Sequence, residues 1–92
     1  MIKKVIKMSA SWCAPCKVYA KAFHEVEKEE KYKDIEFEDV DVEENEDLAL
    51  KYNVRAVPTT IVLGENDNIL AVFSGNVPKK DLEKKLDSLN ND

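Results

Sequence analysis

The chain has 92 residues, of which 43% are hydrophobic and 36% are charged, and its formal net charge is −5. This length suits one small domain over residues 1–92, and the balance of apolar and charged residues excludes a disordered tail. No apolar run approaches the roughly 20 residues that span a bilayer, and the net acidity argues against general nucleic-acid binding. The short, interrupted apolar start is not typical of a secretory signal, so we expect a cytoplasmic protein.

The charge is unevenly distributed along the chain. Residues 1–24 contain five lysines and no carboxylate, whereas residues 25–47 contain thirteen carboxylates and three lysines. Residues 48–92 are balanced, and both cysteines lie in the cationic first segment. Positive charge near a cysteine favours its thiolate and attracts acidic partners, although solvated surface lysines would give the same distribution.

The first half of the chain predicts a strand, a helix and a second strand. We expect the first strand at residues 2–8 and a helix at residues 14–30, where Pro15 suits the first turn because its missing N–H has no partner there. The side chains expected to mark the buried face of this helix are Val18, Ala22 and Val26, with Tyr19 and Phe23 beside them. Residues 35–42 carry apolar residues on both faces, as in a strand that is covered from two sides. A crossover of this length makes the two strands parallel.

The second half predicts a short helix, a hairpin and a last helix. We expect Asn45 to cap a helix over residues 46–52 and Asn53 to end it in a left-handed conformation. The remaining expected elements are strands at 59–63 and 69–74, joined by a turn at 64–68, and a helix that begins at Pro78. The pattern therefore predicts an α/β fold of order βαβ-α-ββ-α, with helices on both faces of a mixed four-stranded sheet.

Both cysteines lie in the segment Trp12–Lys17 and are separated by two residues. Three interpretations of this pair compete. A purely structural disulfide is disfavoured because closing so short a loop removes little chain entropy, roughly 2 kcal/mol against about 5 kcal/mol for a 100-residue loop. A zinc site normally takes four cysteine or histidine ligands. Since His24 lies roughly 12 Å further along the same helix, we expect no bound metal unless two chains share the ion.

The third interpretation is thiol–disulfide exchange. A sulfur at the start of a helix faces unpaired N–H groups and the positive end of the helix dipole, which both stabilise a thiolate. Cys13 lies just before the helix, so we expect its sulfur to be exposed and to attack a substrate. Cys16 lies one turn further in, where we expect it to be buried and to resolve the intermediate.

Four segments carry a family resemblance in the same order along the chain: Trp12–Lys17, Val40–Val42, Leu48–Thr59 and Gly75. Together they resemble the thioredoxins, which implies a thioredoxin-like fold and a redox-active dithiol without a bound cofactor. Residues 2–8 correspond to the family's central strand, so the likeness is to a short, glutaredoxin-sized member without the opening strand and helix. Ala14 stands where the family usually has glycine, and the Ala-Pro pair between the cysteines is similar to that of reducing members.

The resemblance also implies a substrate groove beside the cysteines. Pro58 corresponds to the family's cis-proline that faces the disulfide, where a cis bond exposes the backbone of Val57 for a substrate chain to pair with. Gly75 would line the same groove, since a side chain there would block the approach. The residues expected to contact substrate are Trp12, Ala14, Pro15, Val57, Pro58 and Gly75.

One pair of charges departs from the family's pattern. Thioredoxins carry an aspartate six residues before the first cysteine and a lysine on the neighbouring strand that faces it. Here Lys7 and Asp39 hold these positions, so the signs are exchanged. We hypothesise a buried ion pair of reversed polarity beneath Cys16, in which either residue relays the proton of the resolving cysteine. The alternative is that Lys7 extends to solvent and Asp39 lies exposed at an edge.

The resemblance implies a protein disulfide reductase that acts as a monomer on disulfide-containing proteins. It implies an NADPH-dependent thioredoxin reductase as the source of electrons, while the short chain leaves glutathione open. One alternative is a glutaredoxin-like electron donor to a reductive enzyme such as ribonucleotide reductase. A second is a non-catalytic binding module built on the same fold, and neither a nucleic-acid nor a membrane partner is expected.

Overall fold

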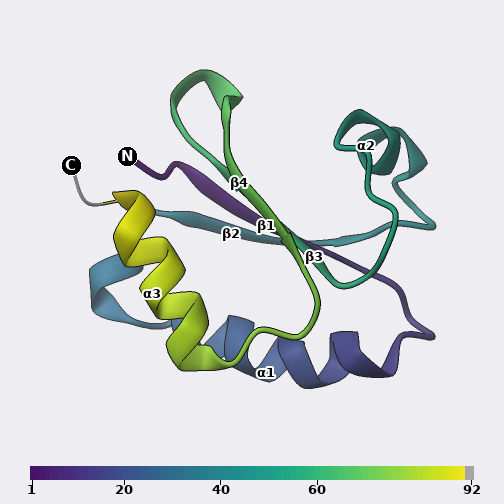
Figure 1. The fold of residues 1–92 in the computed structure, drawn as a ribbon, viewed down its shortest axis with the longest axis horizontal. Coiled ribbons are helices and arrows are strands. Elements are labelled where there is room, and N and C mark those ends of the chain that lie inside the picture. The colour runs from purple at the N-terminus through teal and green to yellow at the C-terminus, as the bar shows by residue number, and fades with distance from the viewer. Residues whose placement is uncertain (91–92) are drawn as a thin grey trace.

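The computed structural model describes residues 1–90, which form one sheet covered by helices (Figure 1). The strands are β1 (Lys4–Ser9), β2 (Glu36–Asp41), β3 (Thr59–Leu63) and β4 (Ile69–Ser74). The α-helices are α1 (Ala14–Glu27), α2 (Glu46–Lys51) and α3 (Lys79–Asn90), and two short 3₁₀ helices lie at Glu30–Tyr32 and Glu65–Asp67. Among the described residues, no helix is both long and apolar enough to cross a membrane.

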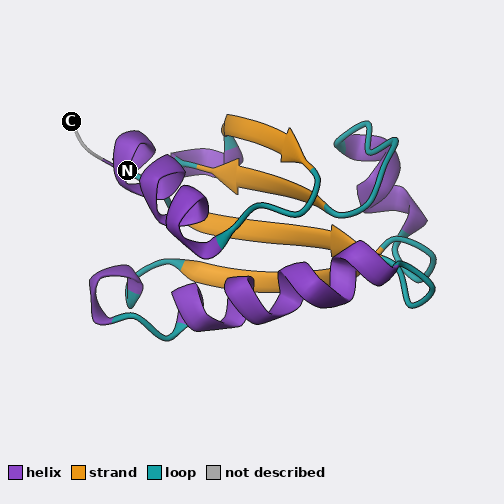
Figure 2. Ribbon diagram, turned by 60° about the horizontal axis from the view of Figure 1, so that its bottom comes forward, coloured by secondary structure: helices purple, strands orange, loops and turns teal. Residues whose placement is uncertain are grey.

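The four strands form a mixed sheet in the order β2-β1-β3-β4. β1 runs parallel to β2, and β3 runs antiparallel to both β1 and β4. In this register Lys7 lies opposite Asp39 on one side and opposite Thr60 on the other. The sheet leaves β2 and β4 as its two edges (Figure 2). The element order and the strand directions confirm the predicted fold class.

Each face of the sheet has its own hydrophobic core. α1 and α3 cover one face, while α2 lies on the other (Figures 1 and 2). The first core joins Val5 and Val62 of the sheet to Phe23 of α1 and Leu86 of α3. The second core joins sheet residues such as Ile61 to partly buried residues of α2 and the segment after it. Alternate residues of β1 enter opposite cores, as the period of two along a strand requires.

Helix α1 differs from its prediction in its end and in its buried face. It stops at Glu27, and the chain turns into the 3₁₀ helix before β2 begins. Its buried side chains are Cys16, Tyr19, Phe23 and Val26. The prediction that Val18 marks the buried face is wrong, because this side chain is exposed. The two large aromatic rings bury more apolar area than Val18 and Ala22 could, and they set the helix orientation.

The segment around α2 confirms two details of the sequence pattern and changes a third. Asn53 has a φ of 55°, the left-handed conformation expected at the helix end. Asn45 occupies the position before the helix, but its side chain makes no hydrogen bond to the first turn. Instead its Nδ2 donates to the carbonyl of Asp41, 3.0 Å away. Asn45 therefore fastens α2 to the end of β2.

Candidate redox site

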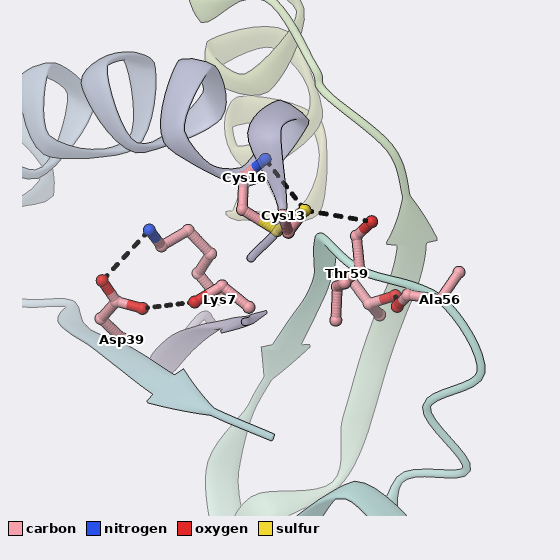
Figure 3. The surroundings of a disulfide bond; sticks show 8 residues. Lys7, Cys13, Cys16, Asp39, Ala56 and Thr59 are labelled. Carbon is pink, nitrogen blue, oxygen red and sulfur yellow. Dashed lines mark hydrogen bonds and ion pairs between the residues drawn. A yellow bond between two sulfur atoms is a disulfide. The ribbon is translucent and has the colours of Figure 1, made fainter. Parts of the chain in front are cut away.

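The two cysteines lie where the loop after β1 enters α1. Cys13 is the residue before the helix and has an extended backbone, and Pro15 stands in the first turn. The two sulfurs form a disulfide (Figure 3). The backbone N–H of Cys16 donates to the Sγ of Cys13 across 3.1 Å, so this sulfur takes the place that an oxygen fills in common helix caps. The first turn thus directs an otherwise unpaired donor at Cys13.

Both cysteines are buried in this disulfide form. Cys16 lies on the buried face of α1, as predicted. The expectation that Cys13 is exposed is wrong, because the residue is only 4% accessible. Cys13 packs with Ala10 and Cys16, and the partly buried side chains of Val42 and Val57 close over this cluster. The Sγ of Cys13 also lies 3.7 Å from the carbonyl oxygen of Val57.

The loop before β3 brings this carbonyl to the disulfide. The peptide bond between Val57 and Pro58 is cis, and Pro58 is buried. The Oγ1 of Thr59 donates to the carbonyl of Ala56 across 2.6 Å, which closes the loop on itself (Figure 3). The N–H of Gly75 donates to the carbonyl of Pro58 across 2.8 Å. These bonds hold the loop between the disulfide and the end of β4.

Gly75 has a φ of 98°, a conformation that side chains other than glycine's seldom adopt. A Cβ built at this position would meet no atom within 4 Å, so the space beside the residue is open. The backbone conformation, together with the short bond to Pro58, therefore explains the glycine. A side chain at position 75 would therefore block the groove only by clashing with a substrate chain that lies in this open space.

Trp12 lies beside the cysteines and is 68% exposed. It lines a shallow groove of about 180 Å³ together with side chains of the loop before β3. The other lining residues are Val42, Val54, Arg55, Ala56 and Val57. Val42, Val54 and Arg55 lie within the family-like segments of the sequence, but only the folded chain brings them to Trp12. Ala14 and Pro15, which follow Cys13 in the sequence, are also exposed.

The charged pair beneath the site forms as the strand register requires. The Nζ of Lys7 lies 3.1 Å from the Oδ2 of Asp39 (Figure 3). The Lys7 side chain is 3% exposed, whereas that of Asp39 is 47% exposed. Only the cation is therefore buried, which the hypothesis of a buried pair did not anticipate. The alternative in which Lys7 extends to solvent is wrong.

Two further groups contact the Lys7–Asp39 pair. The hydroxyl of Ser9 donates to the second oxygen of Asp39 across 3.1 Å. The Lys7 ammonium also lies 5.7 Å from the centre of the Phe23 ring, a distance typical of a cation–π contact. The sequence gives a signal for Ser9, since it lies two residues after Lys7 and so shares its face of the strand.

Comparisons with known proteins agree with this geometry. A family model described as Thioredoxin matches residues 2–88. Thioredoxin H5 of Oryza sativa is 43% identical over 86 residues, which cover 94% of this chain and 61% of that protein. Thioredoxin H2 of Arabidopsis thaliana is 35% identical over 85 residues, with 92% and 61% covered. This chain therefore spans about three fifths of the length of these relatives.

A solved structure shows the same arrangement of strands and helices. Thioredoxin NaTrxh from Nicotiana alata superposes with a TM-score of 0.81 at 32% identity, covering 90% of this chain and 69% of that one. The family model covers nearly all of the described residues, and the cysteine pair falls within it. The chain belongs to the thioredoxin family.

Proposed function

We propose that this chain is a thiol–disulfide oxidoreductase that reduces disulfides in other proteins with Cys13 and Cys16. One observation carries the proposal: the two sulfurs are close enough to bond to each other at the start of α1, where the Cys16 N–H donates to the Sγ of Cys13. A hydrogen bond to a thiolate is stronger than one to a thiol, so this donor favours the attacking form of Cys13. Membership of the thioredoxin family supports the same chemistry.

The reaction proceeds through a mixed disulfide. The thiolate of Cys13 attacks one sulfur of the substrate disulfide; the S–S bond breaks, and the departing sulfur takes a proton. Cys16 then loses its proton and attacks the Sγ of Cys13, which releases the second substrate sulfur. Two electrons pass to the substrate, which leaves as a dithiol, and the chain keeps the Cys13–Cys16 disulfide that the structure contains. An external dithiol or reductase restores the starting state.

The substrate chain lies in extended form beside the loop before β3. The Val57 carbonyl supports this position because it lies 3.7 Å from the Sγ of Cys13 and so adjoins the reacting sulfur. The open space at Gly75 accommodates the backbone of the substrate on the other side of Pro58. Trp12, with the groove beside it, provides an apolar surface for a substrate side chain. Ala14 and Pro15 contact the substrate from the exposed first turn of α1.

In this proposal, Lys7 and Asp39 assist the loss of the proton from Cys16. The buried Lys7 ammonium favours a negative charge on the resolving sulfur, because charges interact strongly where water is excluded. Asp39 holds Lys7 in place and, being half exposed, exchanges protons with solvent. Lys7 thus places a cation where the family has a carboxylate, and the carboxylate of this chain, Asp39, lies on the neighbouring strand β2.

The remaining features of the proposal concern the setting. A catalytic cysteine pair suits a reducing compartment such as the cytoplasm, where an NADPH-dependent thioredoxin reductase supplies electrons to a monomeric carrier. Glutathione is the alternative source of electrons and would make the chain a glutaredoxin-like donor to a reductive enzyme such as ribonucleotide reductase. A binding module without catalysis is the alternative in which the cysteines are dispensable.

The test is an insulin-reduction assay with NADPH, run once with thioredoxin reductase and once with glutathione and glutathione reductase. We expect turnover with thioredoxin reductase and none with Cys13→Ser. Cys16→Ser should also fail to turn over, but it should trap a covalent mixed disulfide with insulin that Cys13→Ser cannot form. Turnover with glutathione alone would favour the glutaredoxin-like role, and no turnover with either source would overturn the proposed reductase.

A further inference from the structure

The two edges of the sheet carry opposite chemistry. β2 presents four carboxylates in six residues: Glu36, Glu38, Asp39 and Asp41. β4 has the sequence ILAVFS and carries no charge at all. Soluble proteins usually protect a free edge with charges, prolines or bulges, because its unpaired backbone groups attract another strand. β2 follows that rule through its charges, whereas β4, the upper strand of the sheet in Figure 2, carries no charge and has only a register shift near its start, opposite Val62 and Leu63.

β4 also exposes apolar side chains and borders a groove. Val72 is 49% exposed. A shallow groove of about 420 Å³ lies between β4 and α3 and is lined by Ala71, Phe73, Leu89 and two lysines, among others. A second groove of about 350 Å³ shares Lys84 and Lys85 and extends to Asn76 and Val77. Because the two grooves share Lys84 and Lys85, they adjoin each other, and we refer to them together as the trough.

The trough is cationic although the chain as a whole is acidic. Lys84 and Lys85 are exposed, and within residues 1–90 neither lies within ion-pair distance of a carboxylate. The Lys85 ammonium lies 5.0 Å from the centre of the Phe73 ring and so borders β4 itself. By contrast, Asp87 of the same helix is paired with Lys31 and lines neither groove. Asp81 is the one carboxylate that lines either groove.

We propose that β4 accepts an extended acidic segment of a partner protein as a fifth strand of the sheet. An added strand would pair with the free backbone groups of β4, and its side chains would alternate between the two faces. Phe73 lies opposite Thr60, whose side chain meets α1, so one row of partner side chains would face Lys84 and Lys85. Val72 lies opposite Ile61 of the second core, so the other row would meet an apolar surface. The segment that fits alternates carboxylates with aliphatic residues.

The test uses a blocked eight-residue peptide of alternating glutamate and valine, and a matched peptide of alternating lysine and valine. We expect the protein to bind the glutamate peptide at least tenfold more tightly than the lysine peptide. In Lys84→Glu/Lys85→Glu the preference should reverse. Lys21→Glu/Lys51→Glu removes two exposed lysines on other elements and should keep the original preference. Should the doubly reversed variant unfold, Lys84→Gln/Lys85→Gln provides the same comparison with a smaller change.

Hydrogen exchange distinguishes strand addition from general attraction between charges. The glutamate peptide should slow exchange of backbone amides in β4 and leave those of β2 unchanged. The inference is independent of the redox proposal, so Cys13→Ser/Cys16→Ser should bind the peptide as the parent does. Equal binding of the two peptides, or binding without protection of β4, would overturn it. Concentration-dependent self-association in place of peptide binding would also overturn it, since the occupant would then be a second copy of this chain.

Discussion

The Lys7 ammonium and the Asp39 carboxylate form an ion pair across 3.1 Å in which only the lysine is buried. When one partner is removed, the charge that remains is therefore in a different environment depending on which residue is lost. Without Asp39, the ammonium remains in an apolar site beside Phe23. Without Lys7, the half-exposed carboxylate keeps its contact with water and its hydrogen bond from Ser9. A buried charge without its partner is costly, whereas a solvated one is not.

This asymmetry predicts unequal effects of the two single substitutions. We expect Asp39→Asn to lower the free energy of unfolding of the oxidised protein by about 1–3 kcal/mol, the usual cost of leaving a buried hydrogen-bonding group without its partner. Lys7→Met should cost less, because an apolar side chain of similar length fills the same site. The double variant should resemble Lys7→Met. Urea unfolding of the four proteins measures the coupling, and strictly additive effects would show that the two side chains do not interact.

The same four proteins test the proposed role of the pair in the reaction. If Lys7 favours the resolving thiolate, Lys7→Met should slow release of the mixed disulfide more than formation of it. A difference of about tenfold corresponds to 1.4 kcal/mol in the barrier. Stopped-flow measurement of both steps between pH 6 and pH 9 separates this effect from stability. A uniform slowing of both steps at every pH would assign Lys7 a structural role only.

The cysteines should differ in reactivity once the disulfide is reduced. Both cysteines are buried in the disulfide form, but the Sγ of Cys13 accepts a hydrogen bond from the Cys16 N–H in the first turn of α1. We therefore expect iodoacetamide at pH 7 to alkylate Cys13 at least ten times faster than Cys16, since the thiolate is the reactive form. Mass mapping of the modified peptides measures both rates. Faster modification of Cys16 would show that Cys13 is not the attacking cysteine and would contradict our mechanism.

Much of the fold follows from patterns that are local in the sequence. The apolar residues of β1, the position of Pro15 and the left-handed Asn53 each follow from a short stretch of sequence. The parallel pairing of β1 and β2 follows from the length of the crossover. Even the Lys7–Asp39 contact could be predicted from the sequence, because in-register parallel strands bring residues at matching positions together.

Other features depend on contacts that no local pattern encodes. Cys13 is buried because Val57, which is 44 positions away, packs against it. Val18 is exposed because the rings of Tyr19 and Phe23 fix the rotation of α1 against the sheet. The solvation of Asp39 depends on β2 being an edge of the sheet. Helix periodicity and residue type therefore predicted the elements, whereas the exposure of Cys13, Val18 and Asp39 depends on how those elements pack together.

Asp87 fastens α3 to the segment after α1 and should make stability depend on acidity. The Tyr32 hydroxyl donates to it across 2.7 Å, and Lys31 lies 3.1 Å away. These contacts lower the pKa of Asp87, so its contribution to stability is present at neutral pH and is lost as the pH falls through the lowered value. Because the side chain is half exposed, we expect Asp87→Asn to cost about 0.5–1 kcal/mol at pH 7. Unfolding curves of the two proteins should converge at pH 2, and a constant difference would exclude this linkage.

Tyr19 provides the corresponding prediction at high pH. Its ring is fully buried, its hydroxyl lies 2.6 Å from that of Thr60, and burial raises its pKa to about 12. An unfolded tyrosine loses its proton near pH 10, so between these values the unfolded state ionises while the folded state does not, and stability falls as pH rises. Tyr32, whose pKa burial also raises to about 12, adds to the same fall. We expect Tyr19→Phe to remove part of the fall, up to about 2 kcal/mol between pH 9 and pH 12.

At neutral pH, Thr60 provides the hydrogen-bond partner of the buried Tyr19 hydroxyl. Thr60→Val leaves that hydroxyl buried without its partner and should cost about 1–3 kcal/mol, whereas Tyr19→Phe/Thr60→Val removes both polar groups together and should cost less than the sum of the single changes. Thermal unfolding at pH 7 of the three variants measures the difference. The bond joins the middle of α1 to β3, the strand that follows the loop at the disulfide. If the single and double costs were additive, α1 would be positioned over the sheet by its apolar contacts alone.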